Sequence, residues 1–133
     1  MTEKKILHLT LKKKFFDMIA SGEKKEEYRA IKPYWVSRLV NSFHSETREG
    51  DFTFLWRGFL SSMESPKHYD CIEFKHGYSK DAPIMIVECI GIKDGFTKLK
   101  WADKYEPAFI IKLGKIISIK NYNPICQILE QGN

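Results

Sequence analysis

The feature that most constrains the fold is a nearly continuous apolar run, IMIVECIGI, at residues 84–92. Its β-branched residues favour a strand, and the lack of clear alternation predicts burial on both faces for much of its length. Asp94-Gly95 is expected to close this strand with a turn. A second apolar run at residues 108–119 contains Gly114, which indicates a bulge or tight bend of the kind that closes a small barrel.

The first 40 residues predict a strand, a helix, a second strand and a second helix. Alternation in residues 6–11 places three leucines on one face of a short strand. A helix is expected next, because apolar residues recur at i, i+4, i+7 and i+8 and share one helical face: Leu11, Phe15, Met18 and Ile19. Gly22 is its expected left-handed C-cap. Pro33 is expected to end the following strand, residues 26–30, and to open a helix over residues 33–40.

Weaker segments complete the expected fold, with strands at residues 52–56 and 69–75 and a helical turn at residues 98–105. The first of these would place Phe52, Phe54 and Trp56 on one face, either as core or as a platform on which bases stack. With five or six strands and helices mainly near the N-terminus, the chain is expected to form one α+β, mainly β domain over residues 1–133.

Charge is distributed unevenly along the chain. Residues 1–40 contain ten Lys/Arg and five Asp/Glu, whereas residues 41–133 contain twelve of each, so the entire excess of +5 lies in the first segment. A basic surface of this kind attracts polyanions such as nucleic acid. The simpler alternative is a solvated face and a frayed terminus.

Composition also limits the cellular setting. No apolar run approaches the roughly 20 residues of a membrane-spanning helix, so no membrane partner is expected. The three cysteines are an odd number without a C-x-x-C pair, which indicates reduced thiols in the cytoplasm. No cofactor is expected, because the chain has no Walker loop and no G-x-G-x-x-G. No metal is expected, because the four histidines lack the spacing of metal ligands: His8, His44, His68 and His76.

A polar cluster is expected where the basic segment meets the second strand. If residues 26–30 are extended, Glu27 and Arg29 share one face of the sheet, and Glu26 and Tyr28 share the other. Lys24 precedes them, just after the glycine turn. A carboxylate and a guanidinium side by side next to a lysine are groups that a core would not favour.

The eight residues GEKKEEYR that carry this cluster match G-x-K-x-x-E-x-R at Gly22, Lys24, Glu27 and Arg29. The segment therefore resembles the ASCH domain family, which belongs to the PUA-like superfamily of RNA-associated β-barrels. The context is similar too, because a short strand and a helix precede the motif. The resemblance implies a PUA-like small β-barrel of five to six strands with one or two N-terminal helices.

The first function that the resemblance implies is binding of RNA, another single-stranded nucleic acid or a modified nucleoside or nucleotide. Lys24 and Arg29 would contact phosphate or a base edge, and Glu27 would accept a hydrogen bond from an exocyclic amine. Lys12 would add positive charge to this surface. An aromatic side chain could stack on a base, with Tyr34, Trp35 and Trp56 as candidates.

Two alternatives stay open. Some ASCH-like proteins are small amidohydrolases acting on N4-acetylated cytidine, in which a lysine matching Lys24 and a threonine at the position of Glu27 are implicated. Here Lys24 would act as base or nucleophile and Glu27 as a proton-transfer group, although Glu27 would also hold Lys24 charged. A further acidic group could come from Asp103 or Glu106. The third possibility is an interaction module in which the cluster is a fold-stabilising salt-bridge network.

Overall fold

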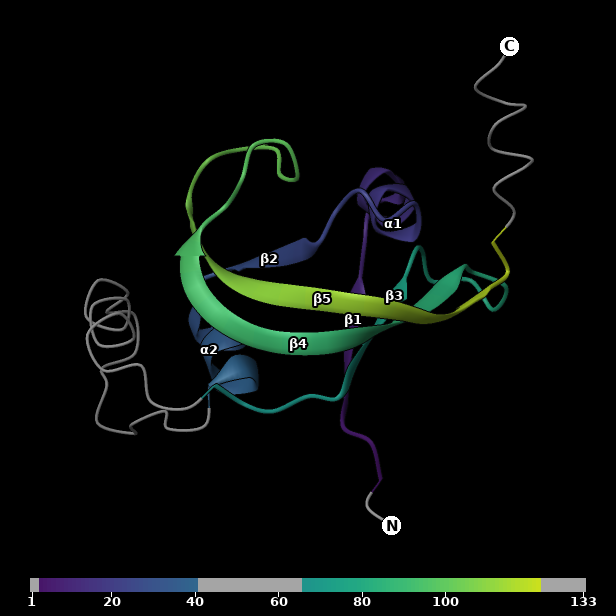
Figure 1. The fold of residues 1–133 in the computed structure, drawn as a ribbon, viewed down its shortest axis with the longest axis horizontal. Helices are drawn as coiled ribbons and strands as arrows, with labels where there is room; N and C mark the ends of the chain where they lie inside the picture. The colour runs from purple at the N-terminus through teal and green to yellow at the C-terminus, as the bar shows by residue number, and fades with distance from the viewer. Residues whose placement is uncertain (1–2, 41–65, 123–133) are drawn as a thin grey trace.

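A five-stranded mixed sheet with the order β1-β3-β4-β5-β2 forms the body of the computed structural model, which describes residues 3–40 and 66–122 (Figure 1). The strands are β1 (Ile6–Thr10), β2 (Glu26–Ala30), β3 (Cys71–Lys75), β4 (Ile84–Phe96) and β5 (Pro107–Lys120). The pair β1–β3 is parallel, and the other neighbouring pairs are antiparallel. The sheet is strongly curled into a half-barrel, which confirms the expected α+β, mainly β fold.

Curvature comes from the long β4–β5 pair, which Figure 1 shows as two bent ribbons side by side. Between the pairs Val87–Ile116 and Cys89–Leu113, β5 contains one residue more than β4. Gly114 lies in this bulge, where an added Cβ would collide with the Glu88 carboxylate. The prediction of a bulge at Gly114 is therefore confirmed.

Two expectations for β4 were wrong. The strand continues through Asp94 and Gly95 to Phe96 instead of turning there. Its burial alternates, because Met85 and Val87 are buried whereas Ile90 is 65% exposed. The reason is that β4 lies in an antiparallel part of the sheet with one face on the core and one outside, a setting that tolerates apolar residues on the outer face.

Two short helices, α1 (Lys13–Ala20) and α2 (Pro33–Leu39), lie in the N-terminal half. Pro33 occupies the first turn of α2, as expected, and Gly22 adopts the left-handed conformation with a φ of 85°. The predicted face of α1 was partly wrong, because Phe16 and Ile19 are its buried residues and Phe15 is only half-buried.

The core fills the space between the helices and the inner face of the sheet. Its largest fully buried side chains come from α1, α2, β3, β4 and β5: Phe16, Leu39, Ile72, Phe74, Met85, Val87, Phe109 and Ile111. Leu7 and Leu9 of β1 are buried together with Leu11, which follows the strand, as predicted.

The remaining expectations concern residues 98–105, the cysteines, membrane-spanning helices and residues 52–56. Residues 98–105 contain neither helix nor strand, and the Trp101 amide donates to the Lys98 carbonyl at 2.9 Å in a single turn. Cys71 and Cys89 are free thiols. Within residues 3–40 and 66–122, no helix has the length and apolar character needed to cross a membrane. The predicted strand at residues 52–56, with the candidate Trp56, lies outside the described residues.

Candidate functional site

A cavity of about 530 Å³ opens where the segment joining β1 to α1 meets β2 and the loop of residues 97–106. Four of the residues predicted to bind the ligand line it: Lys12, Lys24, Glu27 and Arg29. Residues far apart in the chain meet here, because the pairing of β2 with β5 places the end of the 97–106 loop next to Ala30, and the loop reaches back to Lys24 through Trp101.

Lys24 is the most buried charged residue at this cavity. The turn after α1 fixes its backbone, since the Lys24 amide donates to the Met18 carbonyl at 3.0 Å. Its side chain is only 1% exposed. Nζ lies 2.9 Å from Glu27 Oε1, donates to the Trp101 carbonyl at 2.9 Å and sits 3.9 Å from the centre of the Phe15 ring.

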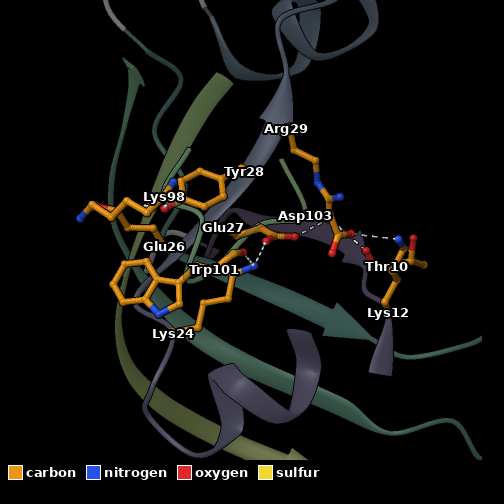
Figure 2. A network of polar contacts seen from close by, with 10 residues as sticks. All are labelled: Thr10, Lys12, Lys24, Glu26, Glu27, Tyr28, Arg29, Lys98, Trp101 and Asp103. Atoms are coloured by element: carbon orange, nitrogen blue, oxygen red, sulfur yellow. Dashed lines mark hydrogen bonds and ion pairs between the residues drawn. The ribbon is translucent and has the colours of Figure 1, made fainter. Parts of the chain in front are cut away.

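Glu27 joins Lys24 to Arg29. Its second oxygen, Oε2, lies 3.1 Å from Arg29 Nη2, which also donates to the Thr10 carbonyl at 2.9 Å. Figure 2 shows the three charged side chains in a row, with Glu27 between the two cations. The strand geometry accounts for this, because residues two apart on β2 project from the same face.

The other face of β2 carries a separate set of contacts, as predicted. The Tyr28 hydroxyl donates to Glu26 Oε1 at 2.8 Å, and Lys98 Nζ lies 3.4 Å from Glu26 Oε2. Burial, followed by the nearby Glu26 carboxylate, raises the pKa of the Tyr28 phenol. Tyr28 therefore stays protonated at neutral pH and acts as a hydrogen-bond donor.

Burial lowers the pKa of Lys24 below its ordinary value, because a charged ammonium loses water around it. The Glu27 carboxylate acts in the opposite direction, as expected from the sequence, and the Arg29 guanidinium adds to the lowering. Desolvation is the largest of these effects. Glu27 thus raises the pKa of Lys24, in the direction expected from the sequence, and offsets part of the effect of burial.

The loop of residues 97–106 forms the opposite wall. Thr97 is 4% exposed and closes the base of the loop, since its hydroxyl donates to the Lys104 carbonyl at 2.7 Å and accepts from the Glu106 amide at 3.0 Å. Trp101 extends from this loop to a position beside Lys24 (Figure 2). The loop thus supplies a backbone acceptor and an aromatic ring to the cavity.

Asp103 and Glu106, the two acidic candidates, both line the cavity but neither contacts Lys24 directly. Asp103 lies 3.3 Å from Lys12 Nζ and 3.4 Å from Lys14 Nζ. The hydrogen bond from Lys12 is the largest effect that lowers the pKa of Asp103. Asp103 therefore links the loop to the start of α1 through two exposed lysines.

Tyr34 and Trp35 lie outside this cavity. They line an adjoining one of about 340 Å³, to which Arg29 also contributes. Arg29 Cζ is 5.2 Å from the centre of the Trp35 ring, a distance that suits a cation–π contact. The predicted binding residues are therefore divided between two neighbouring cavities that meet at Arg29.

Phe15 and Trp101 are site residues that the sequence analysis did not identify. Phe15 belongs to the apolar stripe of a helix, which predicts core, and only its partial exposure shows a different role. Trp101 follows the basic segment Lys98-Leu99-Lys100, and this mixture of cations with an aromatic ring is the one local signal that could have indicated it.

Within the described parts of the chain, no group of three or more His, Cys, Asp or Glu residues is arranged to hold a metal ion. The residues that line the cavity, with Lys24 and Arg29 beside Phe15 and Trp101, give it the chemistry of a partly buried cationic pocket with aromatic walls. Comparisons of the chain with protein-family models, with curated proteins and with solved structures found no match.

Proposed function

We propose that this chain is an ASCH-like, PUA-like domain that binds RNA, another single-stranded nucleic acid or a modified nucleotide, with one nucleotide unit in the 530 Å³ cavity. One observation carries the proposal: two carboxylates at the cavity are each shared by two cations. Glu27 contacts Lys24 and Arg29, and Asp103 contacts Lys12 and Lys14. With the lysines protonated, each cluster has one positive charge in excess.

The exposed cluster supplies the cations that a phosphate could reach. The side chains of Lys12 and Lys14 are 75% and 65% exposed, and their ion pairs with Asp103 are solvated. Such surface pairs contribute little stability, so a phosphate can replace Asp103 as their partner at low cost. The buried cluster suits the base or sugar, because Glu27 can accept from an amine while Phe15 and Trp101 provide apolar walls.

The test is a fluorescence titration with labelled single-stranded RNA and DNA ten-mers at about 50 and about 200 mM salt. Lys12→Ala should weaken binding and reduce the slope of log K against log salt by about one. Arg29→Met should weaken it further, because Arg29 contributes to both cavities. Lys120→Ala is the matched control, since Lys120 is exposed at the end of β5 and lines neither cavity.

No binding at either salt concentration would overturn the proposal, as would equal effects of Lys12→Ala and the Lys120→Ala control. The third possibility, an interaction module in which the cluster only stabilises the fold, would be favoured if the Lys24→Met and Arg29→Met variants bound the oligonucleotides and acted on N4-acetylcytidine just as the wild type does.

We keep the cytoplasm as the expected compartment, because the cysteine count is odd and Cys71 and Cys89 are free thiols.

A second candidate, hydrolysis of an N4-acetylated cytidine, is favoured by one observation. Lys24 combines a lowered pKa with a carboxylate at 2.9 Å, so its neutral amine could act as base or nucleophile while Glu27 transfers the proton. The reaction consumes water and releases cytidine and acetate. Incubation with N4-acetylcytidine tests this candidate, and release of cytidine that Lys24→Met abolishes would make the chain an enzyme.

A further inference from the structure

We infer that the ligand spans both cavities as two consecutive nucleotides, with Arg29 at the phosphodiester between them. This inference rests on the proposed function and deepens it, because it replaces a single bound nucleotide by a dinucleotide segment. Its basis is the way in which the 530 Å³ cavity and the 340 Å³ cavity meet.

The two cavities adjoin at three residues that line both of them: Thr10, Arg29 and Tyr78. Both volumes lie in the range of about 300–1,000 Å³ that is usual for small-molecule sites. A ligand confined to the first cavity would leave the second one open on the far side of Arg29. Two linked units of similar size would fill both.

The second cavity has the side chains that bind a nucleobase. Trp35 is half-buried, and Tyr34 is 55% exposed. The two rings are nearly perpendicular, with 4.8 Å between their centroids, and Arg38 Cζ lies over one face of Tyr34, 3.6 Å from its ring centre. Tyr78 is 87% exposed at the boundary between the cavities. Exposed aromatic side chains next to a cationic groove are the arrangement that binds single-stranded nucleic acid, because every base can stack on an open ring face.

Arg29 is placed to meet a charge between the two units. Its guanidinium is fixed by Glu27 and by the Thr10 carbonyl, yet its side chain is still 20% exposed. Because Glu27 is shared with Lys24, it does not neutralise both cations. A phosphodiester bridging the cavities would supply the missing negative charge at the residue that both cavities share.

The experiment compares mononucleotides with dinucleotides by competition against the labelled RNA ten-mer. The probes are the 5′-monophosphates of uridine and adenosine and the 5′-phosphorylated dinucleotides UpU and ApA. We expect the better dinucleotide to bind at least about tenfold more tightly than its mononucleotide. Tyr34→Ala should weaken the dinucleotide by about five- to 150-fold, the range of base stacking on an aromatic ring, and leave the mononucleotide unchanged.

Tyr105→Ala is the matched control, because Tyr105 is a 65% exposed tyrosine that lines neither cavity. Equal affinities for mononucleotide and dinucleotide would overturn the inference while leaving the proposed function standing. So would a Tyr34→Ala variant that binds the dinucleotide as well as the wild type does. Failure of the ten-mers themselves to bind would overturn the proposed function and this inference together.

Discussion

At the scale of single residues, the site depends on the Glu27 carboxylate. Glu27 is 4% exposed and holds two cations, Lys24 from the glycine turn and Arg29 from its own strand. A buried charge is tolerated only when it is paired, and removing one partner costs much more than the pair itself contributes. Loss of Glu27 would leave a buried lysine and a partly buried arginine without their shared carboxylate, whereas loss of Lys24 would leave Glu27 paired with Arg29.

We therefore predict that Glu27→Gln lowers the free energy of unfolding by about 3–5 kcal/mol, the usual cost of leaving buried charges unpaired. Lys24→Met should cost less, because the methionine is apolar and Glu27 keeps Arg29. Urea unfolding of the wild type and both variants measures this. Similar small losses in the two variants would show that water, and not Glu27, compensates the cations.

The lowered pKa of Lys24 gives a second prediction. Between the folded-state pKa and the ordinary value near 10.5, the unfolded chain binds more protons than the folded one, so stability rises with pH in that window. The free energy of unfolding of the wild type should therefore increase relative to Lys24→Met as the pH is raised from about 7 to about 10. A relative decrease would mean that Glu27 raises the pKa of Lys24 more than burial lowers it.

At the scale of elements, the 97–106 loop is positioned by one buried hydroxyl. Thr97 contacts Lys104 and Glu106 across the base of the loop, and its amide donates to the Glu106 carbonyl at 3.0 Å. The loop in turn presents the Trp101 carbonyl to Lys24. The hydrogen bonds of Thr97 therefore belong to the same loop that supplies the acceptor for Lys24.

Thr97→Val keeps the shape of the side chain and removes its hydrogen bonds. We predict a loss of about 1–3 kcal/mol in stability, because two partly buried hydrogen bonds, to the Lys104 carbonyl and from the Glu106 amide, are lost at about 0.5–1.5 kcal/mol each. Backbone amides of the loop should exchange hydrogen faster, and oligonucleotide binding should weaken. Thr97→Ser is the control, since it retains the hydroxyl. Wild-type exchange rates in Thr97→Val would show that the backbone hydrogen bond alone holds the loop.

The local half of the site could be predicted from the sequence, and the distant half could not. Glu27 and Arg29 lie two apart in a short strand, and Gly22 sets the turn before Lys24, so alternation and turn chemistry were sufficient. Trp101 contacts Lys24 across 77 residues of sequence. The pairing of β2 with β5 places the 97–106 loop beside the Ala30 end of β2, and no local pattern encodes that register or the path of the loop back to Lys24.

Prediction of the fold shows the same limit. The strand at Glu26–Ala30 and the bulge at Gly114 follow from local chemistry and were confirmed. The prediction that β4 is buried on both faces was wrong, because Ile90 is apolar but does not pack in the core. Phe15 was expected in the core for the same reason, whereas it borders the cavity. An apolar side chain indicates a face of an element, but only the packing of the other elements decides whether that face is covered.

At the scale of the whole molecule, the first 40 residues carry the cationic excess and the rest of the chain has no net charge, and Asp103 is a carboxylate of the second part that pairs with two lysines of the first. In the proposed binding function, this carboxylate competes with a phosphate for Lys12 and Lys14. In the alternative hydrolytic function, Asp103 is instead a candidate for the further acidic group. The two functions therefore make different predictions for the substitution Asp103→Asn.

Under the binding proposal, Asp103→Asn should strengthen binding of the RNA ten-mer and steepen its salt dependence, because two exposed lysines lose their protein partner and the net positive charge grows by one. Titration at about 50 and about 200 mM salt measures both effects. The control is Asp81→Asn, a substitution of the same charge at an exposed residue that lines neither cavity. Weaker binding in Asp103→Asn than in this control would mean that Asp103 orders the loop instead of competing with the ligand. Loss of cytidine release without a change in binding would instead identify it as the acid of a hydrolase.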